Sequence, residues 1–242
     1  MRVGVIADIH GNLVALDAVL ADLDRAGVDR VVCLGDVAWG PRPRQVVERL
    51  RGLEYPTILG NADEELFNLP AEAPGDDNAR MTWDIDCWCI EQLSPGDLDY
   101  LRGLRPTLET PLGEGTTLLC FHGSPRSFDD VIVATTPDGD LARMLSGYNA
   151  TVMAGGHTHE QMLRRYKGTI LVNPGSVGLP FERGPAPDEA RNPAWAEYAV
   201  VSREHGVLSV ELRRVLIDLD AVVRAIRESD MPHAEEFAQD WR

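Results

Sequence analysis

The sequence predicts an α/β fold, in which helices cover the faces of a sheet that contains parallel strands. Six short apolar runs recur along the 242 residues, and each ends at a residue with a metal-binding or amide side chain. Helical patterns separate the first three runs. This strand–helix–strand order implies parallel pairing, because the connecting helix crosses a face of the sheet before the next strand begins.

The six runs lie in "VGVIADIH", "RVVCLGD", "YPTILGN", "TTLLCFHG", "ATVMAGGHTH" and "GTILVNPGS". Continuous apolar runs of this kind are typical of strands that are buried on both faces. In open α/β sheets, ligands bind outside the carboxyl ends of the strands. The polar residues that close the runs therefore mark a predicted binding edge; they are Asp8, His10, Asp36, Asn61, His122, His157, His159 and Asn173.

Two helices are expected between the first three runs. Leucine and valine recur at spacings of three and four from Leu13 to Leu23, and Gly27 lies where such a helix would end. Val46, Val47 and Leu50 form a second, shorter amphipathic stretch. Both patterns are typical of helices that bury one side against a sheet.

The middle of the chain has a different pattern. Residues 68–79 are rich in proline, glycine and acidic residues, which predicts a surface loop. Residues 80–93 place apolar side chains on one helical face, namely Met81, Ile85, Trp88 and Leu93. Ser94 and Pro95 then form the N-cap and first position of another helix.

The C-terminal third begins with a second predicted loop, residues 182–194. Two alternating runs, "EYAVVS" and "GVLSVELRRVLI", flank "REHG" and predict a β-hairpin. A last helix is expected over residues 218–229. We interpret residues 1–242 as a single domain, with a helical insertion at about 78–105 and a closing hairpin and helix at about 196–229.

Composition excludes several classes of protein. The chain has 39 acidic and 23 basic residues, a net charge of −16, which disfavours binding to long nucleic acids. No apolar run reaches the ~18–20 residues that a membrane span needs. Asp8 interrupts the N-terminal apolar run too early for a signal peptide, so we expect a cytoplasmic protein that does not bind membranes.

The four cysteines do not predict a disulfide framework. Cys33 and Cys120 lie inside apolar runs, which indicates buried thiols. Cys87 and Cys89 are not spaced like zinc ligands and have no second pair.

Seven of the strand-end residues form a mixture of imidazole, carboxylate and amide groups that suits divalent metals: Asp8, His10, Asp36, Asn61, His122, His157 and His159. Seven ligands are too many for one ion and suit two ions that share a bridging carboxylate. In D-x-H and H-x-H, residues two apart at a strand end point to the same side. Glycines 35, 60, 123, 155 and 156 would let the backbone approach this cluster closely.

Each of these residues also has an ordinary structural interpretation. Asp8 or Asp36 could cap a helix, Asn61 could belong to a turn, and His122 could be a hydrogen-bonded core histidine. The metal hypothesis depends on their joint occurrence, in order, each at the end of an apolar run. The remaining histidines, His205 and His233, are expected to be solvated surface residues.

The motifs "DIHGN", "LGDVAWGP", "LGNADE", "FHGSPR", "GGHTHE" and "NPGSVG" occur in an order that resembles the calcineurin-like metallophosphoesterases, in particular the small bacterial phosphoesterases. The resemblance implies a four-layer α/β/β/α sandwich with two mixed β-sheets. It also implies that one ion is held by Asp8, His10, Asp36 and His159. The other ion would be held by Asp36, Asn61, His122 and His157, with Asp36 as the bridge.

The resemblance implies hydrolysis of small phosphoesters by metal-bound hydroxide, with Asp36, Asn61 and His122 as the catalytic residues. The substrate would be nucleotide-like, and the enzyme a phosphodiesterase or phosphatase. Asn12 and Arg126 are candidates for phosphate contacts, or alternatively a turn residue and a surface residue. The ligand set admits manganese, iron, zinc or nickel. The sequence specifies neither the oligomeric state nor the physiological substrate.

One motif departs from the family pattern. Many members have a histidine after G-N, and that residue is thought to protonate the leaving group; this chain has Ala62. The departure favours substrates with good leaving groups, such as activated diesters or phosphoanhydrides. The alternative function is a non-catalytic interaction scaffold of the same fold, as in the retromer subunit. Degraded metal ligands would indicate a scaffold, and here the ligand set is complete.

Overall fold

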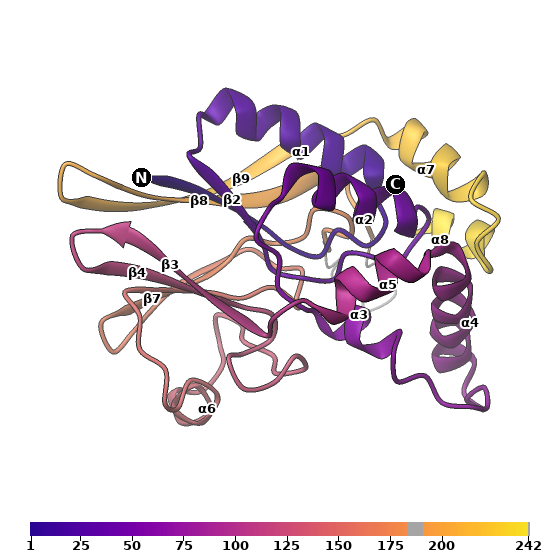
Figure 1. The fold of residues 1–242 in the computed structure, drawn as a ribbon, viewed down its shortest axis with the longest axis horizontal. Coiled ribbons are helices and arrows are strands. Elements are labelled where there is room, and N and C mark those ends of the chain that lie inside the picture. Colours follow the sequence, from indigo (N-terminus) through magenta and orange to yellow (C-terminus); the bar gives the residue numbers. More distant parts are fainter. Residues whose placement is uncertain (183–190, 242) are drawn as a thin grey trace.

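The chain folds into two mixed β-sheets packed face to face, with helices on both outer sides (Figure 1). The structure is a computed structural model that describes residues 1–182 and 191–241. The predicted loop over residues 182–194 falls largely outside these described residues. Four layers result, as expected from the sequence: helices, first sheet, second sheet and helix α6.

The first sheet has four strands in the order β2-β1-β8-β9. β1 pairs in parallel with β2 and antiparallel with β8, so the sheet is mixed. β8 and β9 form a long antiparallel hairpin from the two alternating C-terminal runs. The strands are β1 (Arg2–Ile6), β2 (Arg30–Cys33), β8 (Trp195–Glu204) and β9 (Val207–Leu216).

The second sheet has five strands in the order β3-β4-β5-β7-β6. Its three central strands are parallel, and the two edge strands pair antiparallel with them. The strands are β3 (Thr107–Gly113), β4 (Thr116–Phe121), β5 (Val152–Ala154), β6 (Met162–Tyr166) and β7 (Thr169–Asn173).

Most of the described helices cover the outer face of the first sheet. The core on that side is the largest, and it joins α1, α2, α4, α5, α7 and α8 to the sheet. Helix α6 covers the second sheet. The helices are α1 (Leu13–Ala26), α2 (Pro43–Leu53), α3 (Asn61–Glu65), α4 (Asp77–Gln92), α5 (Pro95–Arg102), α6 (Asp138–Met144), α7 (Leu219–Arg227) and α8 (Ala234–Gln239).

The expected helix boundaries agree well with the structure. Gly27 adopts a left-handed conformation with φ 62° at the end of α1, as its position predicts. Ser94 and Asp97 form a reciprocal capping box at the start of α5. Helix α4 begins at Asp77, with Asp76 as its N-cap, so it takes in the last residues of the predicted surface loop.

One predicted strand is wrong. The run "YPTILGN" forms only isolated bridges, in which Thr57 pairs with Cys33 and Ile58 with Arg105. Pro56 has no backbone N–H, although its carbonyl accepts from the nitrogen of Cys33. The segment therefore runs beside β2 without extending the sheet as a full strand.

His233 also differs from the prediction, because it is exposed but has a partner. His233 immediately precedes α8, and its Nε2 lies 2.9 Å from Oδ2 of Asp84 on α4. His205 is exposed in the hairpin turn, as expected. All four cysteines are free, and Cys33 and Cys120 are buried. None of the helices in residues 1–182 and 191–241 is long and apolar enough to cross a bilayer.

Candidate metal centre

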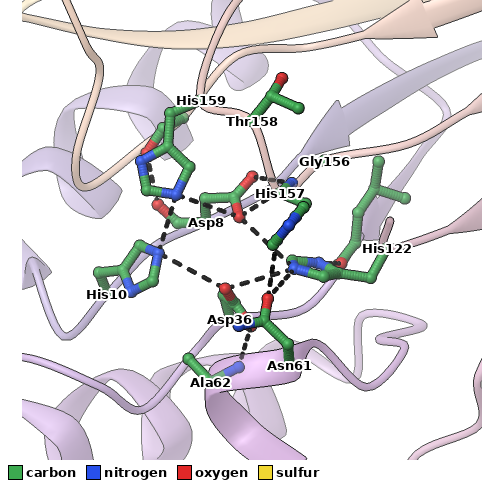
Figure 2. A network of polar contacts seen from close by, with 12 residues as sticks. Asp8, His10, Asp36, Asn61, Ala62, His122, Gly156, His157, Thr158 and His159 are labelled. Atoms are coloured by element: carbon green, nitrogen blue, oxygen red, sulfur yellow. Dashed lines mark hydrogen bonds and ion pairs between the residues drawn. The ribbon is translucent and has the colours of Figure 1, made fainter. Parts of the chain in front are cut away.

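Both sheets contribute to one polar cluster at the carboxyl ends of their strands (Figure 2). Asp8 and His10 follow β1, and Asp36 follows β2 in the first sheet. His122 follows β4, while His157 and His159 follow β5 in the second sheet. Asn61 is the first residue of α3. The structure therefore brings together all seven residues that the sequence predicts as ligands.

Two histidines and one carboxylate form the first part of the cluster. Nε2 of His10 lies 3.1 Å from Nε2 of His159, and the latter atom lies 3.5 Å from Oδ1 of Asp8. The ligand atoms of these three residues all lie within 4.8 Å of one another. Such a set of imidazole nitrogens and a carboxylate oxygen is suited to one divalent ion.

The second part of the cluster lies around Asp36 and His122. Oδ2 of Asp36 is 3.3 Å from Nε2 of His122, and Oδ1 of Asp8 is 4.0 Å from that nitrogen. Oδ1 of Asn61 lies 2.9 Å from Nε2 of His122 and 2.9 Å from Nδ1 of His157. These contacts place Asn61 against two of the three histidines that the second sheet supplies, His122 and His157.

Asp36 lies between the two parts. Its Oδ2 is also 3.6 Å from Nε2 of His10, in addition to the contact with His122. Asp8 belongs to both groups that could hold an ion, one with His10 and His159 and one with Asp36 and His122. The two parts are therefore contiguous, with carboxylates at their boundary.

Backbone carbonyl groups fix the orientation of two imidazoles. Nδ1 of His122 donates to the carbonyl of Leu34 at 2.8 Å, and Nδ1 of His159 donates to that of Leu179 at 2.8 Å. A proton on Nδ1 leaves Nε2 of each neutral ring free to bind a metal. The Nε2 atoms are the ones that face the cluster.

Five of the seven residues adopt the left-handed backbone conformation that favours glycine: Asp8 (φ 55°), His10 (φ 47°), Asp36 (φ 54°), His157 (φ 68°) and His159 (φ 56°). Each such residue costs roughly 1–3 kcal/mol and persists only where its surroundings hold it. Here hydrogen bonds from Asp8 N to Gly35 O and from His10 N to Asp36 O tie the strand ends together. The strain is concentrated in the cluster, as is common at functional sites.

Gly60 and Gly156 provide the space that the carboxylates occupy. A Cβ atom on Gly60 would overlap with Oδ1 of Asp36, and one on Gly156 would lie 2.7 Å from Oδ2 of Asp8. Either methyl group would displace a carboxylate of the cluster. Close packing of backbone against the site, expected for several glycines, is thus confirmed at these two positions.

Asp8, His10, Asp36 and His122 are buried, whereas Asn61, His157 and His159 are half-buried. Burial opposes ionisation of Asp36, but the adjacent His122 holds the pKa of that carboxyl well below its usual range. Burial also opposes the charging of His122, yet Asp36 and Asp8 raise the pKa of that imidazole to about 10. Burial and the neighbouring His159 lower the pKa of His10 to about 4. Two buried carboxylates among imidazoles fit a cationic occupant.

The two predicted phosphate-binding residues have hydrogen-bond partners outside the cluster. Oδ1 of Asn12 accepts from Ala15 N and caps α1, while its Nδ2 donates to the carbonyl of Gly178. The exposed Arg126 donates from its guanidinium to the carbonyl of Ser146, at 3.2 Å. Neither side chain makes a described contact with the cluster, so their contact with phosphate stays a prediction.

The positions next to Asn61 have structural roles. Ala62 is 7% exposed, and its backbone nitrogen donates to Oδ1 of Asp36 at 2.9 Å. Asp63 is fully buried, and its Oδ1 accepts from the backbone nitrogens of Val37 and Ala38. Asp63 therefore holds the loop that carries Asp36.

Two residues of the motif "NPGSVG" support the cluster through its backbone. Asn173 donates from Nδ2 to the carbonyl of Gly156, and the Ser176 hydroxyl donates to the carbonyl of Asp8. The sequence places Asn173 at the predicted binding edge but does not identify Ser176. The spacing of the motif does not show that either residue binds backbone rather than a ligand.

The fold and the cluster together define an α/β sandwich protein with a candidate metal centre. A family model described as the calcineurin-like phosphoesterase superfamily domain matches residues 1–190. The chain belongs to the calcineurin-like phosphoesterase superfamily.

The chain is similar to proteins from several organisms. A metallophosphoesterase from Sphaerobacter thermophilus is 27% identical, with a TM-score of 0.74 over 100% of this chain and 98% of that one. The hypothetical protein PH1004 from Pyrococcus horikoshii shares the fold, with 23% identity and a TM-score of 0.77 over 98% of this chain and 96% of that one. Protein MJ0912 from Methanocaldococcus jannaschii is 27% identical over 74% of this chain and 76% of its own length.

Proposed function

We propose that the chain hydrolyses small phosphoesters at a centre of two divalent transition-metal ions. The observation that carries the proposal is the position of Asp36, whose Oδ2 lies 3.6 Å from Nε2 of His10 and 3.3 Å from Nε2 of His122. One carboxylate thus reaches both halves of a cluster of seven potential ligands. Membership of the phosphoesterase superfamily supplies the type of reaction.

Each ion would have four protein ligands, and Asp36 would serve both. The first would be held by Asp8, His10, Asp36 and His159, three of which already form a compact group. The second would be held by Asp36, Asn61, His122 and His157. These mixed nitrogen and oxygen ligands suit manganese, iron, zinc or nickel. When bound, a pair of such ions supplies a hydroxide nucleophile at neutral pH and offsets the charge of the phosphate oxygens.

The residues of the chain would position the reacting groups. The carbonyls of Leu34 and Leu179 hold His122 and His159 in the tautomer that leaves Nε2 free. The side chain of Asn61 contacts His122 and His157, and this would hold the start of α3 against the two histidines. The buried Asp36 is oriented by the backbone nitrogen of Ala62. A preorganised site of this kind lowers the barrier without further rearrangement.

The substrate would be a small phosphoester with a good leaving group, such as an activated diester. Ala62 carries a methyl group where many family members have the histidine that protonates the leaving group. The net charge of −16 disfavours long nucleic acids as substrates.

Elemental analysis of protein loaded with manganese, together with hydrolysis of p-nitrophenyl phosphate and bis(p-nitrophenyl) phosphate, tests the proposal. We expect about two ions per chain and turnover of at least one ester. His159→Ala should reduce both, whereas His205→Ala, which alters an exposed histidine, is the matched control. Metal content below one ion per chain would contradict the two-metal centre. Two bound ions without hydrolysis of either ester would favour the scaffold instead.

A further inference from the structure

A cavity of about 360 Å³ lies between α3, α4 and the segment that joins them. We call it the α3–α4 pocket; its lining includes Glu65, Leu69, Pro70, Pro74, Trp83 and Asp86. The volume falls in the ~300–1,000 Å³ range of small-molecule sites. The pocket is not part of the predicted ligand cluster, so its role is a separate question.

Glu65 connects the pocket to the cluster. It lines the pocket, and it lies one helical turn after Asn61, a residue of the cluster. Both residues belong to α3, which spans Asn61–Glu65 and thus forms little more than one turn. A substrate whose phosphate lies at the cluster could therefore place its organic part in the pocket.

The walls of the pocket are mainly apolar. Leucine, proline, alanine and tryptophan side chains contribute most of the lining. Nε1 of Trp83 on α4 donates to the carbonyl of Pro70 at 3.1 Å, which fixes the segment before α4 against the helix. A preformed apolar wall of this kind suits a rigid organic group rather than a hydrated one.

The charged side chains that line the pocket are both acids, Glu65 and Asp86. Asp86 is only 3% exposed, and its Oδ1 is buried without a hydrogen-bond partner. Burial and the neighbouring Glu65 raise the pKa of Asp86 to about 7. A largely buried carboxyl with an unpartnered oxygen is costly, so a ligand that donates to this carboxyl from the pocket would gain affinity. None of the described lining residues is lysine or arginine, which disfavours a second phosphate group there.

Building on the proposed phosphoesterase activity, we propose that the α3–α4 pocket binds the organic part of the substrate, a nitrogen heterocycle with an N–H donor directed at the carboxyl of Asp86, which lines the pocket. The apolar walls accept the ring, the buried carboxyl accepts the N–H, and the acidic lining excludes polyphosphate. A nucleobase combines these properties.

Binding of nucleosides, measured by titration calorimetry on the full chain, tests this proposal without requiring turnover. Uridine and 3-methyluridine differ at the N–H donor, and so do guanosine and purine riboside. We expect the member of at least one pair that carries the donor to bind about tenfold more tightly, because its analogue leaves the buried acceptor unpaired. The nucleoside that binds should also inhibit hydrolysis of bis(p-nitrophenyl) phosphate competitively.

Two variants locate the binding. Asp86→Leu should abolish the preference for the N–H donor, and Trp83→Ala should weaken binding of both members of a pair. Glu91→Gln is the matched control, since it removes an exposed carboxylate from the same helix. Thermal unfolding of each variant verifies that it is folded, and the comparison of paired nucleosides on the native chain does not depend on any variant.

The outcomes distinguish the two proposals. If the esters are hydrolysed but no nucleoside binds, or if binding is unaffected by both Asp86→Leu and Trp83→Ala, the pocket assignment is wrong and the activity stands. If neither ester is hydrolysed by metal-loaded protein while nucleosides bind with the expected preference, the catalytic proposal fails and the pocket remains a nucleobase site.

Discussion

Gly60 packs directly against Asp36, and the contact leaves no space for a side chain. A Cβ on Gly60 would overlap with Oδ1 of Asp36 and would lie 2.8 Å from its Cγ. The same carboxylate oxygen accepts from the backbone nitrogen of Ala62. The position of the predicted bridging carboxylate is therefore set by the absence of one methyl group.

We expect Gly60→Ala to move Asp36 away from its place between His10 and His122. A misplacement of about 1 Å at a catalytic group can cost about 100-fold in rate. Hydrolysis of bis(p-nitrophenyl) phosphate and metal content measure the effect. Gly52→Ala is the control, because a Cβ there meets nothing within 4 Å. Equal activity of the two variants would show that Asp36 does not need its present position.

Asp36→Asn should cost more activity than any other single change among the seven residues. The amide keeps the size of the side chain but removes the charge that both ions would share. Activity should fall by several orders of magnitude, and metal content should fall with it. His159→Ala, which affects only one of the proposed ions, is the comparison. Near-native turnover by Asp36→Asn would exclude a bridging role.

Metal binding should release protons at neutral pH. Asp36 and Asp8 overcome the effect of burial and raise the pKa of His122 to about 10, so this imidazole holds a proton below that pH unless a metal displaces it. Calorimetric titration with manganese in buffers of different ionisation enthalpy counts the protons released. Activity should decline as the pH falls, and excess metal should partly restore it. Metal uptake at neutral pH without proton release would contradict the assignment of His122.

The native protein should depend steeply on the acidity of the leaving group. A positioned general acid contributes roughly 10²–10⁴-fold to expulsion of a poor leaving group, and the methyl group of Ala62 cannot protonate one. Esters with graded leaving-group pKa measure the dependence. Ala62→His should restore some turnover of alkyl esters and make the rate less dependent on the leaving-group pKa. A flat dependence in the native protein would mean that another residue supplies the proton.

Asp86 should make the protein less stable as the pH rises. Burial raises its folded pKa to about 7, above the ordinary value of 3.8, so between these values the unfolded chain loses the proton before the folded one does. Stability therefore declines across that range. Asp86→Asn should raise the unfolding temperature at about pH 8 and have little effect at about pH 4, with Glu91→Gln as the control. No difference between the pH values would show that the carboxyl ionises freely in the folded protein.

The central strands could be predicted from the sequence, but the two edge strands of the second sheet, β3 and β6, could not. β1, β4 and β7 are continuous apolar runs, because both of their faces are covered by other layers. By contrast, β3 contains Pro111 and a register shift, and β6 contains two arginines. Edge strands often contain proline and charged residues, so their sequences resemble those of loops.

The cluster itself could be predicted because its members come at the ends of apolar runs. Its supporting contacts could not. Glu65 and Asp86 lie on different helices, and nothing in their spacing shows that they line one cavity. Asn12 caps α1 through Ala15 N and donates to the carbonyl of Gly178, and its place after D-x-H shows neither contact. The local sequence pattern shows which residues end the strands, whereas the supporting contacts depend on tertiary packing between distant elements.

Because the first sheet supplies Asp8, His10 and Asp36 while the second supplies the remaining histidines, the metal centre does not exist in either half alone. During synthesis, Asp8 emerges from the ribosome well before His159. A nascent chain therefore offers only partial chelation until the sandwich closes. Loading with metal would then be a late event that reports on correct assembly of both sheets, and bound ions would cross-link the two halves against later separation.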